Sequence, residues 1–313
     1  MEVSIVIPVW NRAEMVKPTL ESVVSQTHRP LHLVLVDNNS TDATLIVLND
    51  FKQKNETPDL KIDVISETTA GACAARNAGM ALVQSEWVMF FDSDDTMDEN
   101  LVAKYVEKIE SSNGEVDIVT SKVDIDDGKG VKGVFFASHD YMENHIFHGL
   151  LSTQRYIVRK SLCEKAGAWN NEVKCWNDWE LGIRLLLQSP RVDSITDGVY
   201  VHIKVHKDSI TGARYSDNHE RRENALQVAL TAVENSDYKD KKRVQRLLKA
   251  RRFVLAGLYK KEGRNDLAQL YYKASLADVK DDKVLRVIAP IVRDYVGMGG
   301  RGIDRLIRLM AGC

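Results

Sequence analysis

Residues 3–37 read VSIVIPVWNRAEMVKPTLESVVSQTHRPLHLVLVD, and this segment sets the fold class. Two short runs rich in β-branched residues, 3–9 and 31–36, enclose a segment, 12–25, with apolar residues at helical spacing. A strand, a helix and a second strand in this order are typical of a parallel sheet, because parallel strands need a crossover connection. The sequence therefore predicts an α/β protein.

The same alternation continues to about residue 119, with further strands expected at 61–66, 87–91 and 117–121 and helices at 42–54 and 70–83. Each strand ends at polar or Gly, Asn and Asp residues. Because the carboxyl ends of parallel strands meet at one edge of a sheet, we expect the ligand-binding loops to gather there.

The pattern changes after residue 121. Residues 122–150 predict a loop or hairpin insertion, with a turn signal at Asp127-Gly128. Weaker signals then predict strands at 154–158 and 198–205 and helices at 160–166 and 177–187. From about His219 onward the pattern is helical, and residues 256–276 predict an αα-hairpin.

The charge distribution supports a division of the chain near residue 213. Residues 1–213 carry 21 basic and 32 acidic side chains, whereas residues 214–313 carry 22 and 13, so the two parts have charges of −11 and +9. We predict one domain over 1–213, with parts at about 1–121 and 122–213, and a basic helical extension over 214–313. The basic surface predicts contact with the acidic part of the same chain, with a membrane face or with an acidic partner, and solvated surface helices are the alternative.

Other features narrow the class of protein. Four cysteines form no CxxC pair, which favours a reducing compartment. The N-terminal apolar run lacks a basic segment and is too short for a signal peptide, and no stretch approaches 18 apolar residues. We therefore expect a cytoplasmic protein, with peripheral contact at the inner membrane face as a further possibility. Aromatic residues interleave the basic extension only at Tyr259, Tyr271 and Tyr272, so we expect no nucleic-acid partner.

The most informative polar cluster is Asp92-Ser93-Asp94-Asp95, which follows an apolar strand directly. Three neighbouring carboxylates repel one another, and a hard cation such as Mg²⁺ or Mn²⁺ relieves that repulsion through oxygen ligands. The alternative is that Asp94, Asp95 or Asp98 caps the helix that begins near Glu99.

Two more segments carry polar groups at strand and helix ends. Asp37, at the end of the second strand, can accept a hydrogen bond from the imide N–H of a pyrimidine base, or it can simply belong to a turn. Arg76 is the single guanidinium in a helix of small residues, Gly71–Gly79, and can bind a diphosphate or lie on the surface.

The segment around Asp178 combines a carboxylate with aromatic residues. Trp176 and Trp179 flank Asp178 at the start of a predicted helix. Aromatic faces stack on sugar rings while a carboxylate can take a hydroxyl proton, but a helix cap between two core tryptophans has the same spacing. His202 and His206 lie on or after a strand, where metal ligation is the commonest functional role.

These segments together resemble the inverting glycosyltransferases of family two, which have the nucleotide-diphospho-sugar transferase (GT-A) fold. The resemblance covers about residues 2–212, and its order and spacing make it specific. It is carried by SIVIPVWNR (4–12), LVDNNSTDAT (35–44), AGACAARNAGMAL (70–82), WVMFFDSDD (87–95), VRKSLCEKAGAWN (158–170), CWNDWELGIRL (175–185) and VHKDSIT (205–211).

The resemblance implies a mixed, mainly parallel sheet and a role for each matching residue. It implies that a sugar passes from a nucleotide-diphosphate sugar, with UDP as the favoured carrier, to a carbohydrate or lipid-linked acceptor with inversion. Asp178 would be the catalytic base, and Trp176 and Trp179 would contact the acceptor. The donor-side roles are base and ribose contacts for Pro8, Val9, Asn11 and Asp37, diphosphate contact for Arg76, and donor binding on the ribose side for Asp92. The metal ligands would be Asp94, which also binds the donor, and His206, with support from Asp95.

Three positions depart from the family pattern. Trp10 replaces the usual tyrosine, VDNNS replaces the commoner VDDGS, and Asn177 replaces the glutamate that usually precedes the base. The loss of that glutamate removes a like charge that raises the pKa of a neighbouring carboxyl, which implies a weaker base at Asp178. A non-catalytic module that binds nucleotide-sugars or carbohydrates on the same scaffold is the competing hypothesis.

Overall fold

The computed structural model of this chain describes residues 1–126, 128, 130–134, 140–205, 214–303 and 307. It forms two compact units, one of Met1–His139, Leu150–Glu172 and Gln188–Asp208, the other of Asp140–Gly149, Val173–Leu187 and Ser209–Cys313. The segments Asp140–Gly149 and Val173–Leu187 thus belong to the same compact unit as the C-terminal helices. The functional division into 1–213 and 214–313 stays a prediction.

The first unit is built on a seven-stranded sheet of order β10-β6-β9-β4-β1-β2-β3. Only β9 runs antiparallel, to both of its neighbours, so the predicted mixed, mainly parallel sheet is confirmed. The strands are β1 (Val3–Val9), β2 (Leu31–Asp37), β3 (Leu60–Ser66), β4 (Trp87–Phe90), β6 (Ile118–Thr120), β9 (Tyr156–Arg159) and β10 (Val192–Ser194).

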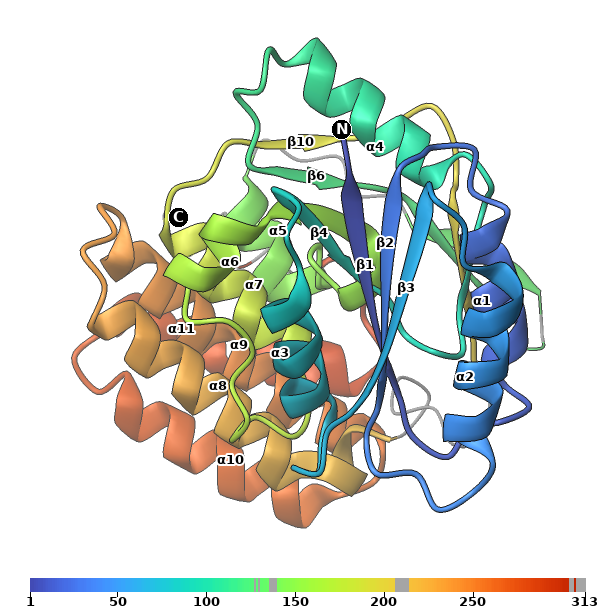
Figure 1. Cartoon of the computed structure of the whole chain (residues 1–313). Coiled ribbons are helices and arrows are strands. Elements are labelled where there is room, and N and C mark those ends of the chain that lie inside the picture. The colour runs from blue at the N-terminus through green and yellow to red at the C-terminus, as the bar shows by residue number, and fades with distance from the viewer. Residues whose placement is uncertain (127, 129, 135–139, 206–213, 304–306, 308–313) are drawn as a thin grey trace. The chain divides into compact units, whose positions relative to one another are not determined.

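Helices cover both faces of this sheet, which explains why every residue of β2 and every residue of β1 except Pro8 is buried. Figure 1 shows α3 (Ala72–Leu82) on one side of β1 and β2, and α1 (Val16–Val24) and α2 (Thr44–Asn55) on the other. Gly79 permits the close approach of α3, because a Cβ at this position would lie 2.4 Å from Val6 and 3.0 Å from Val36. The small residues of α3 therefore allow this helix to pack closely against the sheet.

A second sheet of order β5-β11-β7-β8 follows the end of β4. Its strands are β5 (Thr96–Met97), β7 (Val123–Asp126), β8 (Val131–Val134) and β11 (Val201–Lys204). Antiparallel pairing of β7 with β8 confirms the hairpin predicted after residue 121. The unit also contains α4 (Leu101–Ser111), a short 3-10 helix (Thr153–Arg155) and α6 (Lys160–Lys165).

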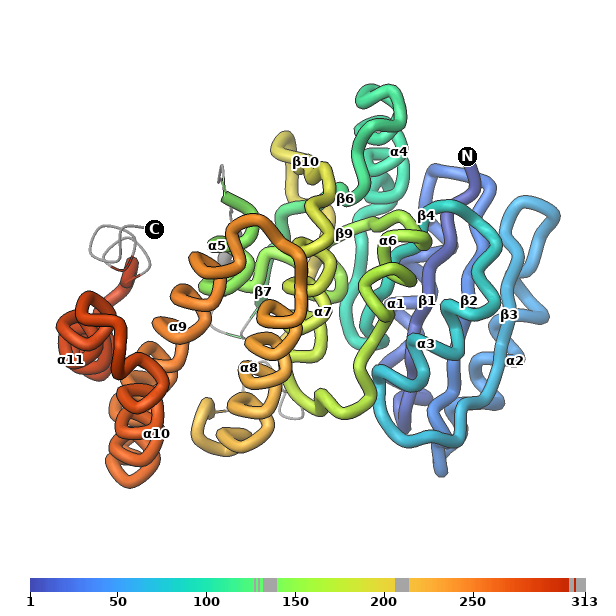
Figure 2. The backbone as a smooth tube through the Cα atoms, turned by 90° about the vertical axis from the view of Figure 1, so that its left-hand side faces the viewer, coloured from blue at the N-terminus to red at the C-terminus, as the bar shows by residue number. Residues whose placement is uncertain are grey.

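The second unit is helical over its described residues. It contains α5 (Tyr141–His148), α7 (Asn177–Leu187), a 3-10 turn (Tyr215–Asn218), α8 (His219–Glu234), α9 (Lys241–Lys261), α10 (Asn265–Asp278) and α11 (Lys283–Gly297). Figure 2 shows α9, α10 and α11 as neighbours, coloured orange to red. The turn at Gly263 between α9 and α10 has φ +80°, and the predicted αα-hairpin is confirmed.

Several elements differ from the prediction for local reasons. Helix α1 begins at Val16 rather than Arg12, because residues 13–15 form a turn. Strand β9 begins at Tyr156, after a 3-10 turn over the two residues predicted as strand. Helix α5 was not predicted, although Asp140 caps it by accepting from the Glu143 N–H at 2.9 Å and Gly149 ends it at φ +65°.

Of residues 301–310 in the basic extension, the structure describes 301–303 and 307. Ile303 and Ile307 are both buried. Membrane contact by the basic extension stays a prediction. Across the described ranges, no helix combines the length and the apolar character needed to span a bilayer.

Candidate functional site

Arg76 and Asp92 form an ion pair at the carboxyl end of β4. The Arg76 Nη2 donates to Asp92 Oδ1 at 2.6 Å, and the guanidinium lies 4.3 Å from the ring centre of Trp169. The Arg76 side chain is buried, whereas Asp92 is about one-third exposed. Arg76 is thus no surface arginine, and its position fixes the orientation of the first carboxylate of the DSDD segment.

Gln154 joins Asp92 to Asp95. Its Nε2 donates to Asp92 Oδ2 at 2.8 Å and to Asp95 Oδ2. Asp95 Oδ1 also accepts from the Lys204 N–H of β11 at 3.1 Å, so Asp95 is held by two elements far away in the sequence. Its carboxylate does not cap α4; Asp98 accepts from the Asn100 N–H at the start of that helix.

The carboxylates of this cluster lack sufficient positive charge. Burial, and then repulsion by Asp92 and Asp94, raises the pKa of Asp95 to about 8. Asp94 is half-buried. Oxygen ligands with excess negative charge fit Mg²⁺ or Mn²⁺, which take one or two protein carboxylates and complete their shell with phosphate oxygens and water.

Protein side chains alone do not complete a metal site in the described part of the chain, where no three His, Cys, Asp or Glu side chains are arranged to bind an ion. The predicted ligand His206 lies outside the described residues. The donor set therefore fits a metal that shares its ligands with a diphosphate.

Asp37 ends β2 beside the end of β1. It is buried; its Oδ2 accepts from the Ser40 N–H at 3.3 Å, and its Oδ1 is buried with no hydrogen-bond partner in the described ranges. A buried carboxylate oxygen without a donor is costly, and an imide N–H of a base supplies such a donor. The Asp37 Oδ1 atom can therefore accept the hydrogen bond that the predicted contact with a base requires.

The loop after β1 is tied to the loop after β2 through Asn11. Its N–H donates to Ser40 Oγ at 2.9 Å, and its Oδ1 accepts from the Thr41 N–H at 2.8 Å. Pro8 is half-buried and pairs with Val36, while Val9 is buried and pairs with Asp37. The structure thus brings Pro8, Val9, Asn11 and Asp37 together at one edge of the sheet.

Asp178 and the two tryptophans lie in the second unit. Asp178 is in the first turn of α7, where its Oδ1 accepts from the Trp179 N–H at 2.8 Å. The rings of Trp176 and Trp179 are 5.3 Å apart. Trp176 is half-buried, whereas Trp179 is buried and its indole N–H donates to the Ile146 carbonyl at 3.1 Å. Trp179 therefore serves as a support beneath Trp176.

Sequence analysis missed the residues that hold these side chains in place. Gln154 precedes β9 and has no motif around it, and Trp169 follows α6 in a turn with Gly167 and Ala168 at positive φ. The Asn77 Nδ2 donates to the Trp169 carbonyl at 2.8 Å, and the Asn77 Oδ1 accepts from the Trp169 N–H at 3.0 Å. Gly167 in the sequence GAWN indicated a turn before Trp169, but no sequence pattern indicated the contact between Trp169 and Arg76.

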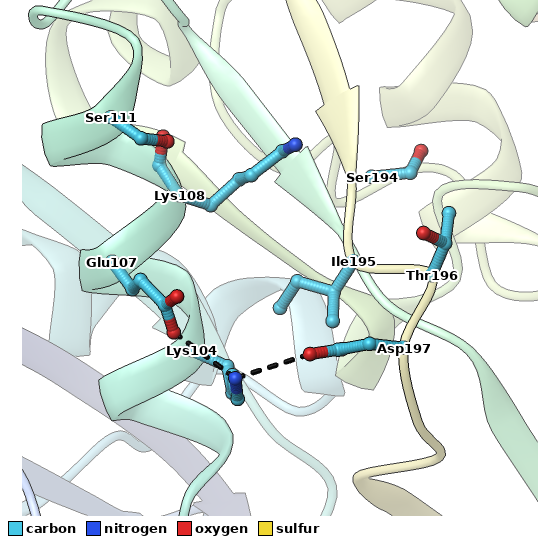
Figure 3. A pocket seen from close by; sticks show the side chains of 8 residues that line it. All are labelled: Lys104, Glu107, Lys108, Ser111, Ser194, Ile195, Thr196 and Asp197. Atoms are coloured by element: carbon cyan, nitrogen blue, oxygen red, sulfur yellow. Dashed lines mark hydrogen bonds and ion pairs between the residues drawn. The ribbon is translucent and has the colours of Figure 1, made fainter.

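A hollow of about 260 Å³ lies elsewhere in the first unit, between α4 and the segment after β10. Figure 3 shows Lys104 and Lys108 on one side and Ser194, Ile195, Thr196 and Asp197 on the other. Lys104 pairs with Glu107 and with Asp197, both at 3.1 Å. No predicted site residue lines it, so we do not assign it to the donor.

A comparison with models of protein families shows which family the chain belongs to. The model for glycosyl transferase family 2 matches residues 4–162, half of the chain and all of the donor-side residues described above. The chain belongs to glycosyl transferase family 2. The matching parts of the chain span only 39%, 22% and 51% of the length of three curated relatives, so its own activity is a matter for proposal.

Two relatives and two solved structures illustrate the similarity. A poly(ribitol-phosphate) beta-glucosyltransferase of Bacillus spizizenii is 26% identical over 78% of this chain and 39% of its own. The Staphylococcus aureus poly(ribitol-phosphate) beta-N-acetylglucosaminyltransferase TarP is 27% identical over 68% of each chain.

Among structures, S. aureus TarS 1–349 with UDP-GlcNAc has a TM-score of 0.74 at 18% identity, covering 96% of this chain and 93% of that one. The mannosyltransferase PcManGT of Pyrobaculum calidifontis with GDP-Man and Mn²⁺ has a TM-score of 0.61 at 17% identity, covering 99% and 84%. The predicted GT-A fold with a helical C-terminal region is confirmed.

Proposed function

We propose that this chain is a metal-dependent, inverting glycosyltransferase that transfers a sugar from a UDP-sugar to an acceptor hydroxyl in polysaccharide or glycan biosynthesis. The observation that carries the proposal is the Arg76–Asp92–Gln154–Asp95 cluster at the end of β4. Membership of the family and the UDP-GlcNAc bound to TarS support it.

The donor would lie along the carboxyl edge of the first sheet. Asp37 Oδ1, buried and without a donor in the described ranges, would accept from the uracil imide. Pro8, Val9 and Asn11 would line the base and ribose. Arg76 would keep Asp92 oriented and place positive charge near the diphosphate.

Asp94 and His206 would hold the metal ion, with Asp92 on the ribose side and Asp95 in support. When bound, Mn²⁺ or Mg²⁺ supplies Lewis-acid neutralisation of the charge on the leaving diphosphate. The Mn²⁺ in the PcManGT complex supports this part of the proposal.

Asp178 would act as the general base. Its carboxylate takes the proton of the acceptor hydroxyl, whose oxygen attacks the anomeric carbon as the bond from that carbon to the diphosphate breaks. The electron pair of that bond leaves with UDP, and a single displacement inverts the anomeric configuration. The proton transfer contributes about 10²–10⁴-fold to the rate.

The test is release of nucleoside diphosphate from a panel of nucleotide-sugars with Mn²⁺, because transferases leak sugar to water. We expect turnover of a UDP-sugar that EDTA and Asp94→Ala abolish. Asp98→Asn is the matched control, because the Asp98 carboxylate accepts from the Asn100 N–H in the turn before α4, and the variant should keep its activity. Binding of a UDP-sugar without turnover would favour the non-catalytic module, and EDTA-resistant turnover would refute the metal assignment.

A further inference from the structure

Two arginines of the second unit lie against Trp176. The Arg251 guanidinium carbon, on α9, is 5.2 Å from the Trp176 ring centre, and that of Arg222, on α8, is 5.8 Å away. Arg222 is also 4.8 Å from the ring of Tyr215 and is only 3% exposed. Arg251 and Trp176 are half-buried, so this cluster is partly open to solvent.

The hydrogen-bonding capacity of these two arginines is not used up. Arg222 Nη1 donates to the carbonyls of Arg214, at 3.1 Å, and Tyr215, and the Tyr215 phenol is the polar neighbour of Arg251. The Nε atoms of Arg222 and Arg251 are both buried without a hydrogen-bond partner among the described residues. Such orphaned donors point to a missing acceptor.

Their charge is also uncompensated. Within the described ranges neither Arg222 nor Arg251 has a carboxylate partner. Arg252, the next residue along α9, shows the contrast, since it pairs with Glu223 at 3.0 Å and with Asp278. Burial, reinforced by the charge of Arg222, lowers the pKa of Arg251. Two neighbouring guanidinium groups without a carboxylate partner favour an anionic ligand.

The pair lies next to the helix that carries the predicted base. Trp176, the residue that both guanidinium groups contact, immediately precedes α7, and Asp178 is the second residue of that helix. Trp176 has φ +59°, a strained value for a bulky residue, and its ring is held between Trp179 and Tyr215. Strain maintained in this way is typical of functional sites.

We propose that Arg222 and Arg251 bind a phosphate group of the acceptor, so that the acceptor is a phosphate-bearing polymer rather than a neutral glycan. Planar guanidinium groups donate through paired N–H groups to phosphate oxygens. The two non-bridging oxygens of a phosphodiester share its negative charge, so each guanidinium can donate to one of them. This inference rests on the proposed glycosyl transfer, because it names the acceptor of that reaction.

The test measures binding of poly(glycerol phosphate) to the full chain by calorimetry, with dextran as the neutral and poly(galacturonic acid) as the carboxylate polymer. We expect the phosphate polymer alone to bind. Arg251→Gln should weaken that binding by about 10- to 100-fold, the range for a charge-assisted hydrogen bond, and Arg251→Lys by less. Arg286→Gln, an equal charge change on the exposed face of α11, should bind like the original chain.

Four results would overturn the inference: equal binding of dextran, equal binding of poly(galacturonic acid), the same loss in Arg286→Gln as in Arg251→Gln, or a loss of UDP affinity in Arg251→Gln. The last result would assign the arginines to the donor diphosphate. If the Arg251 variants do not fold, phenylglyoxal labelling of Arg251 in the unmodified chain replaces them, and the phosphate polymer alone should protect it. Turnover of a UDP-sugar tests the proposed function separately from this inference.

Discussion

The Arg76 guanidinium holds Asp92 by a 2.6 Å hydrogen bond while its flat face lies 4.3 Å from the ring centre of Trp169. A helix, a strand end and a turn thus meet at one side chain. This arrangement orients the first carboxylate of the DSDD segment before any ligand arrives, which is the kind of preorganisation that catalysis uses.

Replacement of Arg76 tests that role. Arg76→Met keeps the length of the side chain but removes the ion pair with Asp92, which retains its hydrogen bond from Gln154, so we expect a loss of about 1–3 kcal/mol in the free energy of unfolding. UDP affinity should also fall. Arg76→Lys keeps the charge without the flat stacking group and should be intermediate. Urea unfolding and calorimetry give the two quantities, and unchanged UDP affinity in Arg76→Met would remove Arg76 from the donor site.

The orphan oxygen of Asp37 makes a prediction about the uracil base. Methylation of the imide nitrogen removes the donor that Asp37 would accept, so the chain should prefer UDP over N3-methyl-UDP by about tenfold. Asp37→Ala should lose the preference, while Asp59→Ala, at an exposed carboxylate, should retain it. An equal preference in the original chain and in Asp37→Ala would show that the base binds elsewhere.

Gly79 controls how closely α3, which carries Arg76, approaches the sheet. A Cβ in Gly79→Ala would meet Val6 at 2.4 Å, and we expect the strain to outweigh the better helix propensity of alanine and cost about 1–3 kcal/mol. Ala81→Ser, at an exposed position of the same helix, is the control. Thermal unfolding measures both, and a variant as stable as the original would mean that β1 and α3 can separate freely.

Glu223 predicts how stability depends on pH. Burial raises the pKa of Glu223 to about 7, although Arg252 lies 3.0 Å away. Since the folded-state pKa exceeds the ordinary value of 4.5, ionisation of Glu223 destabilises the fold as pH rises from about 4.5 to 7, by up to about 3 kcal/mol. Glu223→Gln should therefore gain stability over the original chain between pH 5 and pH 8. A difference that stays constant across this range would contradict the assignment.

The sequence predicted the strands and the loops at their carboxyl ends well, because β1, β2 and β4 are almost entirely buried and consist mainly of apolar residues. It did not predict Gln154 or Trp169, whose importance comes from contacts with Asp92, Asp95 and Arg76 across the fold. Helix α5 was missed although Asp140, Glu143 and Gly149 provide its end signals. Residues in local sequence motifs could therefore be predicted, whereas the residues that position them are recognised only from contacts in the tertiary structure.

The rate of sugar transfer by Asp178→Asn, measured together with its affinity for UDP, tests the proposed reaction most directly. The substitution keeps the size of the side chain and removes its ability to take a proton. We predict a fall in transfer of about 10²–10⁴-fold with UDP affinity unchanged. Transfer that persists at more than a few per cent of the original rate would show that another group, or none, deprotonates the acceptor.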